Sequence, residues 1–214
     1  MGDVMGQLTR LLDRYPSLEQ CRDEVFAAYL TLESTVERDG LILVCGNGGS
    51  AADGDHIVGE LMKGFSLRRP LNSDERVAFL EQFSNEGSRL ADNLQGAIRA
   101  ISLTTHTALL TAFANDCEPE YTLAQQAWGY GRRGDSLICI STSGNSRNVV
   151  RAAQVARVIG MRVIGLTGEH GGTLRDLCDV TIRVPGGSTA DVQEYHLPVY
   201  HALCLMLEQR FFAE

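Results

Sequence analysis

Two short turns rich in glycine and hydroxyl side chains carry the strongest chemical signal in this sequence. They are residues 46–50 (GNGGS) and residues 141–146 (STSGNS). Each turn follows an apolar, strand-like run and leads into helical sequence. That geometry gathers backbone N–H groups at a helix N-terminus, where an anion is favoured. The two turns therefore predict a small phosphorylated ligand.

The second turn is the more specific of the two. Its hydroxyls suit a dianionic phosphate, because neutral donors and a helix N-terminus can bind one without a lysine. Helix capping also uses Ser, Thr and Asn, but four hydroxyls and a glycine in six residues exceed what a cap needs. The glycine turn alone is weak evidence, since it matches neither the dinucleotide G-x-G-x-x-G pattern nor a Walker loop.

Side chains that could transfer protons or bind a metal lie in two later helical segments. His56 and Glu60 are spaced i, i+4 and share one helix face, although such a pair is more often a surface pair than a site. Gln193 and His201 lie in an apolar C-terminal segment, where a histidine is by default a satisfied core residue. A straight helix separates them by about 12 Å, which is long for two ligands of one metal. Asn115-Asp116 is either a polar turn or a pair that binds sugar hydroxyls.

The elements that must position these residues alternate between strand and helix. Apolar, β-branched runs predict strands at 41–45, 101–105, 137–141, 162–167 and 180–184. Helices are predicted at about 49–63, 120–130, 146–160, 172–178 and 190–212. Strands without polar alternation are typical of a sheet covered on both faces. The pattern predicts an α/β fold, a three-layer α/β/α sandwich with a five-stranded parallel sheet, whose ligands sit outside the strand C-terminal ends.

Two more helical regions complete the expected organisation. Residues 1–36 are predicted to form N-terminal helices, divided at Pro16. Residues 66–99 are predicted to be a helical insertion near the mouth of the site. A length of 214 residues suits a single domain spanning 1–214.

Net charge, apolar runs and cysteine spacing limit the kinds of molecule that the protein is expected to bind and the compartment in which it is expected to work. The net charge of −8 and the pI near 5.1 argue against binding to nucleic acid or to an anionic membrane. Neither a signal-peptide core nor an apolar run of ~20 residues occurs, which predicts no membrane span. The six cysteines include no C-x-x-C pair, so we expect reduced thiols in a cytoplasmic protein.

Taken in order, these motifs resemble the sugar isomerase (SIS) domain family, and within it the phosphoheptose isomerases. The resemblance covers roughly residues 37–212, and the ordered set is far more specific than any single motif. The matching residues are the two turns, His56, Glu60, Asn115-Asp116, Leu166-Thr167-Gly168, Ile182 to Pro185, Gln193, Glu194, His196 and His201.

The resemblance implies an aldose–ketose isomerase acting on a sugar phosphate, most closely on sedoheptulose 7-phosphate, through an enediol. Glu60 is then the base that moves a proton between C1 and C2, and His201 is the acid/base at the sugar oxygens. A zinc ion, one per subunit, would be bound by His56, Glu60, Gln193 and His201. The implied substrate contacts are Asn47, Gly48, Gly49, Ser50, Glu60, Asn115, Asp116, Ser141, Thr142, Ser143, Ser146 and Gln193. The family also implies a homotetramer with sites at subunit contacts.

Two departures leave the identity of the sugar open. Relatives carry an arginine where this chain has Gly64, and Lys63, Arg68 or Arg69 could supply the missing charge. The insertion at about 72–99 is absent from the compact form of the enzyme.

The alternative function is a non-catalytic phosphosugar-binding protein, either a sensor or a DiaA-like adaptor. A deaminase or an aminosugar isomerase of the same family fits the helix motifs less well. The presence of both Glu60 and His201 favours the enzyme, because a sensor has no use for two positioned proton-transfer groups.

Overall fold

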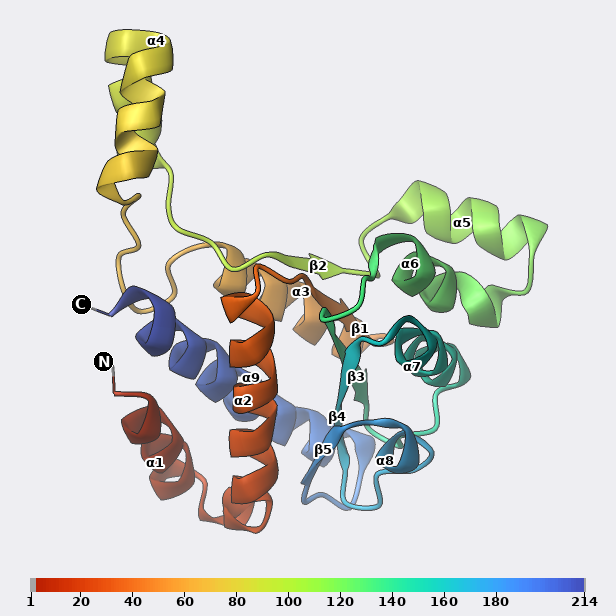
Figure 1. Cartoon of the computed structure of the whole chain (residues 1–214). Coiled ribbons are helices and arrows are strands. Elements are labelled where there is room, and N and C mark those ends of the chain that lie inside the picture. The colour runs from red at the N-terminus through yellow and green to blue at the C-terminus, as the bar shows by residue number, and fades with distance from the viewer. Residues whose placement is uncertain (1–2, 214) are drawn as a thin grey trace.

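A central parallel sheet organises the chain, and Figure 1 shows it in a computed structural model that describes residues 3–213. Its five strands lie in the order β2-β1-β3-β4-β5. They are β1 (Ile42–Cys45), β2 (Ala100–Ser102), β3 (Ser136–Ser141), β4 (Arg162–Gly168) and β5 (Val180–Val184). All neighbouring pairs are parallel, so the strand C-terminal ends share one edge.

Helices cover both faces of this sheet. One face carries α1 (Val4–Arg14), the 3-10 helix η1 (Pro16–Cys21), α2 (Arg22–Glu37), α3 (Gly49–Met62) and α9 (Thr189–Phe212). The other carries α6 (Thr122–Tyr130), α7 (Arg147–Ile159) and the short α8 (Leu174–Leu177). The three-layer α/β/α sandwich predicted from the sequence is thereby confirmed. No helix within residues 3–213 is long and apolar enough to cross a membrane.

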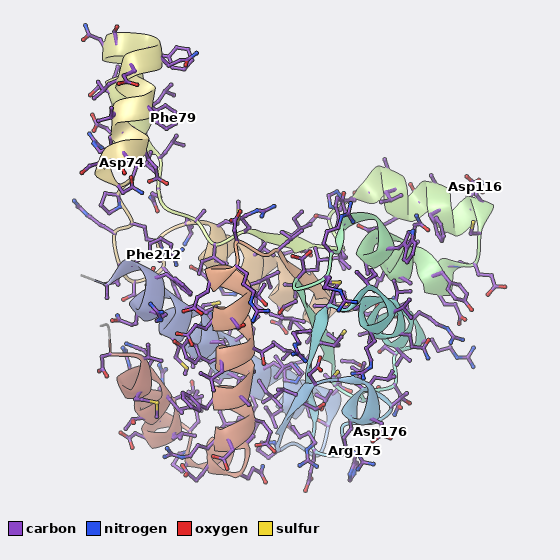
Figure 2. All side chains as sticks on the ribbon, in the orientation of Figure 1. Asp74, Phe79, Asp116, Arg175, Asp176 and Phe212 are labelled. Atoms are coloured by element: carbon purple, nitrogen blue, oxygen red, sulfur yellow. The ribbon has the colours of Figure 1, made fainter. Side chains whose placement is uncertain are left out.

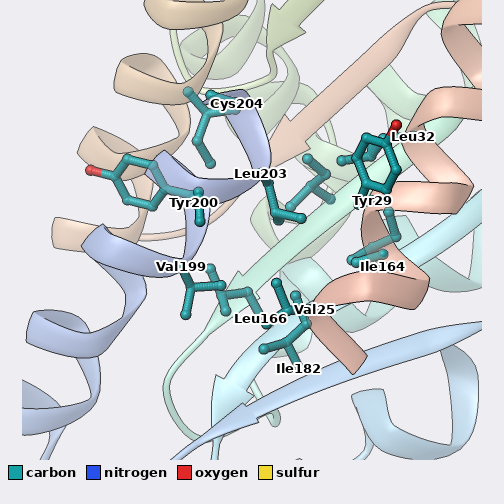
Figure 3. Packing of buried hydrophobic residues seen from close by; sticks show 14 of the residues in the cluster. Val25, Tyr29, Leu32, Ile164, Leu166, Ile182, Val199, Tyr200, Leu203 and Cys204 are labelled. Atoms are coloured by element: carbon teal, nitrogen blue, oxygen red, sulfur yellow. The ribbon is translucent and has the colours of Figure 1, made fainter. Parts of the chain in front are cut away.

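Side chains of alternate residues in the buried strands pack in two separate hydrophobic cores, one on each face of the sheet. Ile42 and Val44 of β1 pack on the α2–α3–α9 face, while Leu43 and Cys45 pack on the α6–α7 face. Figure 3 shows part of the first core, where Tyr29 of α2 and Tyr200 of α9 lie over the sheet. Strands buried on both faces need apolar residues at every position, which is why no polar alternation marks them in the sequence.

Two elements project from the body. Helix α4 (Ser73–Asn93) reverses direction at Ser84, whose φ of 50° is non-helical, and so forms a hairpin of two helical arms. A Cβ on Gly87 would collide with the carbonyl oxygen of Phe79, so glycine permits the arms to pack closely. Helix α5 (Thr107–Asp116) has no buried residue and lies against α6 and the 3-10 helix η2 (Pro119–Tyr121). Figure 1 shows both elements extending beyond the layers.

The differences from the predicted elements are local. The sequence interpretation missed α5 and placed Asn115-Asp116 in a possible turn; the structure puts both residues in the last turn of that helix. Strand β2 spans three residues and ends before Leu103. Pro16 begins a 3-10 helix, as expected of a proline at a first helical position. Pro198 does not break α9, which continues to Phe212.

Candidate functional site

Helices α3 and α9 lie side by side and run in the same direction. At the start of α3, a Cβ on Gly49 would collide with the side-chain amide of Gln193. Two turns later, His56 Nδ1 lies 2.9 Å from the Tyr200 hydroxyl, and both pairs are separated by 144 residues in sequence. This constant offset means that each turn of α3 faces a defined turn of α9.

A carboxylate and two imidazoles meet where these helices pass each other. His56 Nε2 is 3.2 Å from Glu60 Oε1, and the rings of His56 and His201 lie edge to face with centroids 5.0 Å apart. The Glu60 side chain is 12% exposed and that of His56 is 43% exposed. The cluster is therefore protected but reachable, which suits groups that exchange protons with a small molecule.

His201 is the most protected nitrogen base of the cluster. Burial lowers the pKa of His201, the neighbouring His56 lowers it further, and Glu60 opposes both effects. Its Nε2 is buried and has no hydrogen-bond partner among the described residues. A neutral imidazole with a free nitrogen can accept or donate a proton at a substrate oxygen.

A cavity of about 510 Å³ opens beside His201. Phe65 and Ser66 line it together with α9, and α1 contributes Arg10 and Arg14. The volume is in the range of small-molecule sites, so a sugar-sized ligand can reach His201 from this side.

Lys63 is the cation that contacts Glu60. Its Nζ donates to Glu60 Oε2 over 2.9 Å, and it is the only lysine in the sequence. Of the three cations that could replace the family arginine, Arg68 is exposed and Arg69 is fully buried. Lys63 alone places its charge on the carboxylate.

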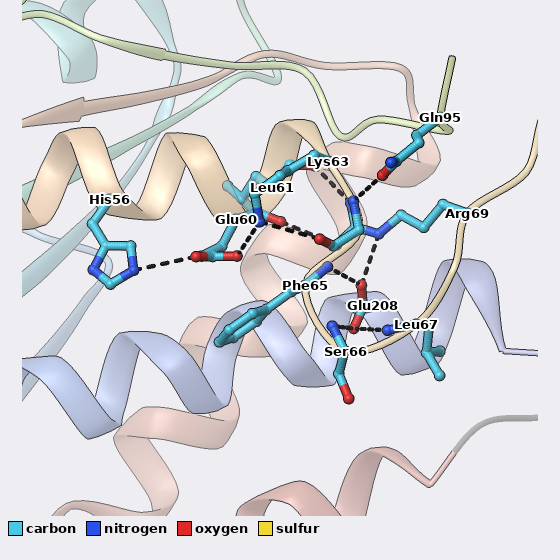
Figure 4. Close-up of polar contacts among 11 residues, drawn as sticks. His56, Glu60, Leu61, Lys63, Phe65, Ser66, Leu67, Arg69, Gln95 and Glu208 are labelled. Carbon is cyan, nitrogen blue, oxygen red and sulfur yellow. Dashed lines mark hydrogen bonds and ion pairs between the residues drawn. The ribbon is translucent and has the colours of Figure 1, made fainter. Parts of the chain in front are cut away.

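Arg69 and Glu208 instead fix the end of α3 (Figure 4). Their side chains pair at 2.9 Å and are both fully buried. Arg69 donates to the carbonyl oxygens of Leu61 and Glu60, over 2.8 Å and 3.1 Å. Glu208 accepts the backbone N–H groups of the following loop, from Phe65, Ser66 and Leu67. Because these bonds tie the last turn of α3 to α9, they hold Glu60 opposite His201.

The two glycine- and hydroxyl-rich turns form a second group at the strand C-terminal ends. Asn47 and Asn148 exchange amide hydrogen bonds of 2.9 Å and 2.8 Å, so the glycine turn is joined to the first turn of α7, which directly follows the serine turn. Gly48 has a φ of 54°, and a Cβ there would meet nothing within 4 Å. Ser50 is buried in the first turn of α3. The open side of Gly48 leaves room for a ligand to approach the backbone.

The serine turn places several hydroxyls beside the start of α7. The Ser141 and Ser146 hydroxyls are 3.0 Å apart, and Ser146 precedes α7 without capping it through its side chain. Thr142 and Ser143 line a cavity of about 190 Å³ that extends to the start of α9. A helix start without a side-chain cap, beside several hydroxyls, favours an anion.

Within one chain, the two groups are separate. Glu60 lies eleven residues beyond Gly49, or roughly 16 Å along α3, which is farther than a seven-carbon sugar reaches. Figure 2 shows Asp116 at the outer end of the projecting α5, and the Asn115 side chain donates to Asp116 over 3.0 Å. The structure thus gathers the predicted residues into three places: the Glu60 cluster, the joined turns and the tip of α5.

The predicted metal ligands are likewise divided. Because α9 is continuous, Gln193 stays at Gly49, while His201 lies beside His56. In one chain these two residues do not share a site, as the spacing along a straight helix implied. Within residues 3–213 no three His, Cys, Asp or Glu side chains form a group that could hold a metal ion.

Sequence reasoning missed several residues of the site. Asp53 accepts the Tyr200 O–H over 3.3 Å, and its spacing of three residues from His56 was an available signal. Asn148 and Tyr200 gave no local signal, since their partners are more than a hundred residues away. Arg10 and Arg14 belong to a helix that carries no motif.

Comparison with known proteins relates this architecture to one family. A family model described as "SIS domain" matches residues 78–168. A phosphoheptose isomerase from Akkermansia muciniphila is 32% identical over 209 residues, which cover 98% of this chain and 97% of that protein. Another from Nitratiruptor sp. is 36% identical, with 90% and 89% covered.

Solved structures agree. Phosphoheptose isomerase GmhA from Neisseria gonorrhoeae superimposes with a TM-score of 0.73 at 31% identity, covering 95% of this chain and 94% of that one. A phosphoheptose isomerase from Francisella tularensis gives a TM-score of 0.72 at 28% identity, covering 94% and 98%.

Proposed function

This chain belongs to the phosphoheptose isomerase family of SIS-domain proteins, and we propose that it interconverts a ketose phosphate and an aldose phosphate. The proposed substrate is sedoheptulose 7-phosphate, the proposed product D-glycero-D-manno-heptose 7-phosphate. The observation that carries the proposal is the convergence of Glu60, His56 and His201 between α3 and α9. An aldose–ketose conversion needs a carboxylate base and a proton donor at the sugar oxygens, and this cluster supplies both.

Glu60 takes the proton from the carbon beside the carbonyl group and returns it to the neighbouring carbon, so that an enediol lies between the two sugars. Lys63 donates to one oxygen of this carboxylate over 2.9 Å and fixes its orientation, while His56 Nε2 lies 3.2 Å from the other oxygen. His201 moves a proton between the two sugar oxygens. Its lowered pKa keeps the ring neutral near pH 7, so it can both give and accept a proton.

The phosphate group is assigned to the serine turn, with Ser141, Thr142, Ser143 and Ser146 as donors. The joined glycine turn, through Asn47, Gly48, Gly49 and Ser50, is assigned to the sugar. Two observations support this: Ser146 leaves the start of α7 uncapped, and the space beside Gly48 is open.

A second copy of the chain would unite the groups that one chain keeps apart. We propose a homotetramer in which the turns and the Asn115-Asp116 pair of one subunit meet the Glu60 cluster of another. The projecting elements support this, because α5 has no buried residue and α4 exposes Val77, Leu80 and Phe83. Such apolar surface is typical of interaction sites. A single 23 kDa species in sedimentation at working concentration would contradict the assembly.

The cluster fits a zinc ion in its donor chemistry. His201 Nε2 is buried without a partner, and His56 Nε2 and Glu60 Oε1 lie together nearby. Two imidazoles and a carboxylate are ligands that zinc accepts. As placed in one chain they form no group that could hold the ion, so we propose that His56, Glu60 and His201 would bind zinc once the subunits assemble. Gln193 would have to come from another subunit. When bound, zinc would polarise the sugar carbonyl oxygen.

A reducing, cytoplasmic location also remains our prediction. All six cysteines are unpaired, and four of them are buried in the core.

The experiment that tests the function is incubation with sedoheptulose 7-phosphate in deuterated water. We expect conversion to the aldose with solvent deuterium at C2. In Glu60→Gln the rate should fall about 10²–10⁴-fold, whereas Glu86→Gln, on the exposed hairpin, should match the wild type. Binding of sugar phosphates without turnover or exchange would indicate the sensor instead.

A further inference from the structure

The Tyr200 hydroxyl lies between two side chains of α3. Tyr200 is 2% exposed, and its oxygen is 3.3 Å from Asp53 Oδ1 and 2.9 Å from His56 Nδ1. Its ring meets the ring of His56 edge to face, with centroids 5.5 Å apart. The rest of the side chain packs in the apolar core with Val199 and Leu203, so only the hydroxyl takes part in the polar contacts.

One assignment of the hydrogens follows from Tyr200 donating to Asp53. A phenol has one hydrogen to donate, and an ionised carboxylate can only accept. Hydrogen bonds to a charged acceptor are the stronger ones, so the Tyr200 hydrogen goes to Asp53. The Tyr200 oxygen then presents lone pairs to His56, and the 2.9 Å contact requires a hydrogen on Nδ1.

We propose that Tyr200 and Asp53 are positioning residues that hold neutral His56 as the tautomer protonated at Nδ1. The consequence lies on the other side of the ring, where Nε2 keeps a bare lone pair 3.2 Å from Glu60 Oε1. Two acceptors facing each other do not bond, but they can share a cation. Lys63 satisfies the second oxygen of Glu60, so the carboxylate does not depend on a hydrogen from His56.

This arrangement prepares His56 to act as a ligand through Nε2. Metal-binding histidines ordinarily donate their other N–H to a carboxylate or another acceptor, which fixes the tautomer and the ring orientation. Here Tyr200 is the acceptor for the His56 N–H, and Asp53 in turn accepts the hydrogen of Tyr200. The proposal rests on the proposed function for the use made of His56, but the tautomer itself does not depend on turnover.

The first experiment measures the tautomer directly. The protein is labelled with ¹⁵N-histidine, freed of metal, and studied by NMR at a pH where the histidines are neutral. His56 should show the pattern of an Nδ1–H, Nε2-bare ring. A predominantly Nε2–H ring in the wild-type protein would overturn the proposal, whatever the isomerase assay shows.

The second experiment removes each positioning group. Tyr200→Phe deletes only the hydroxyl, and Asp53→Asn supplies an amide that can donate to the Tyr200 oxygen. Both should shift His56 toward the Nε2–H tautomer and weaken zinc binding about 10–100-fold in competition with a chelator. Unchanged tautomer and zinc affinity in both variants would overturn the proposal.

Tyr29→Phe is the matched control. Tyr29 is 3% exposed in the same core and donates to Glu33 over 2.8 Å, away from the site. It should lose similar thermal stability without altering the His56 spectrum or zinc affinity. If Tyr200→Phe does not fold, Asp53→Asn and the wild-type spectrum still decide the question. Absence of turnover with the Nδ1–H tautomer intact would count against the isomerase alone.

Discussion

The α3–α9 pair and the projecting elements α4 and α5 differ in which side chains they bury and which they expose. Between α3 and α9, even charged groups are buried and bonded, as in the Arg69–Glu208 pair. On α4 and α5, large apolar side chains such as Phe83 and Leu109 remain exposed, and the ion pair of Arg89 with Glu86 lies in solvent. The first region is complete within one chain, whereas the second has surface that one chain does not cover.

Because of this difference, one part of the proposed site should depend on the stability of a single chain and another on the assembly of subunits. The position of Glu60 relative to His201 should follow the stability of a single chain, because every bond that sets it is intramolecular. The meeting of that cluster with the two turns should follow assembly, because Glu60 lies roughly 16 Å along α3 from Gly49 of the glycine turn. Substitutions in the two regions should therefore change different measurements.

The largest effect on stability is expected from Arg69→Met. Removing one partner of a buried ion pair leaves the other charge uncompensated and costs about 3–5 kcal/mol in the free energy of unfolding. Urea denaturation measures it. Arg89→Met, which breaks an exposed pair on α4, should cost less than about 1 kcal/mol. Equal losses in the two variants would remove the contrast between the regions.

A pH effect of similar size is expected from His196, also on α9. Burial lowers the pKa of this histidine from 6.5 to about 4. Between these values the unfolded chain binds a proton that the folded chain does not, so stability falls as the pH drops through this window. The full loss in the free energy of unfolding, once the pH is below both pKa values, is roughly 3 kcal/mol.

Urea denaturation at pH 7.5 and pH 4.5 measures this dependence. His196→Met should flatten it, while His170→Gln, at an exposed position, should keep it. A slope that survives His196→Met would assign the effect to other groups.

A smaller effect on the body is expected from Gly87→Val. The new side chain collides with the Phe79 carbonyl and forces the arms of α4 apart. Since no other helix or strand within residues 3–213 makes extensive contact with the hairpin, hydrogen exchange should rise within Ser73–Asn93 and remain low in β3 and β4. Faster exchange throughout the sheet would show that the hairpin supports the core after all.

The smallest effect on folding is expected from Leu109→Ser on α5. Leu109 is already exposed, so the free energy of unfolding of one chain should change by less than about 0.5 kcal/mol. If α5 is a subunit contact, sedimentation should show a shift toward smaller species and activity should fall with it. Unchanged assembly would remove α5 from the proposed interface.

The body of the fold could be predicted from the sequence because its signals are local. Runs such as residues 137–140 are apolar at every position, and a turn or a helix start follows each one. Helix α5 was not predicted, because a helix without a buried face lacks the pattern that identifies amphipathic helices. The reversal of the chain at Ser84 was not predicted either. The two hairpin arms contact mainly each other, so no pattern of burial against the body marks the reversal.

The motifs name a set of candidate site residues, but they do not give its arrangement. The motifs pointed to Glu60 and His201, and the structure places them together. The spacing along α9 correctly warned that Gln193 and His201 are far apart. The bonds that orient the cluster were invisible, because Asp53 and Tyr200 are 147 residues apart and Arg69 and Glu208 are 139 apart. Such pairs become neighbours only when α3 and α9 pack against each other.

The solitary amine at Lys63 gives this protein a chemical handle that few others offer. A reagent that acylates amines would find one lysine side chain in each subunit besides the α-amino group, with the lysine nitrogen 2.9 Å from the Glu60 carboxylate. A fluorophore coupled there would sense ligand arrival without any engineered cysteine. By the same reasoning, immobilising the protein through lysine would tether it beside the proposed reaction centre.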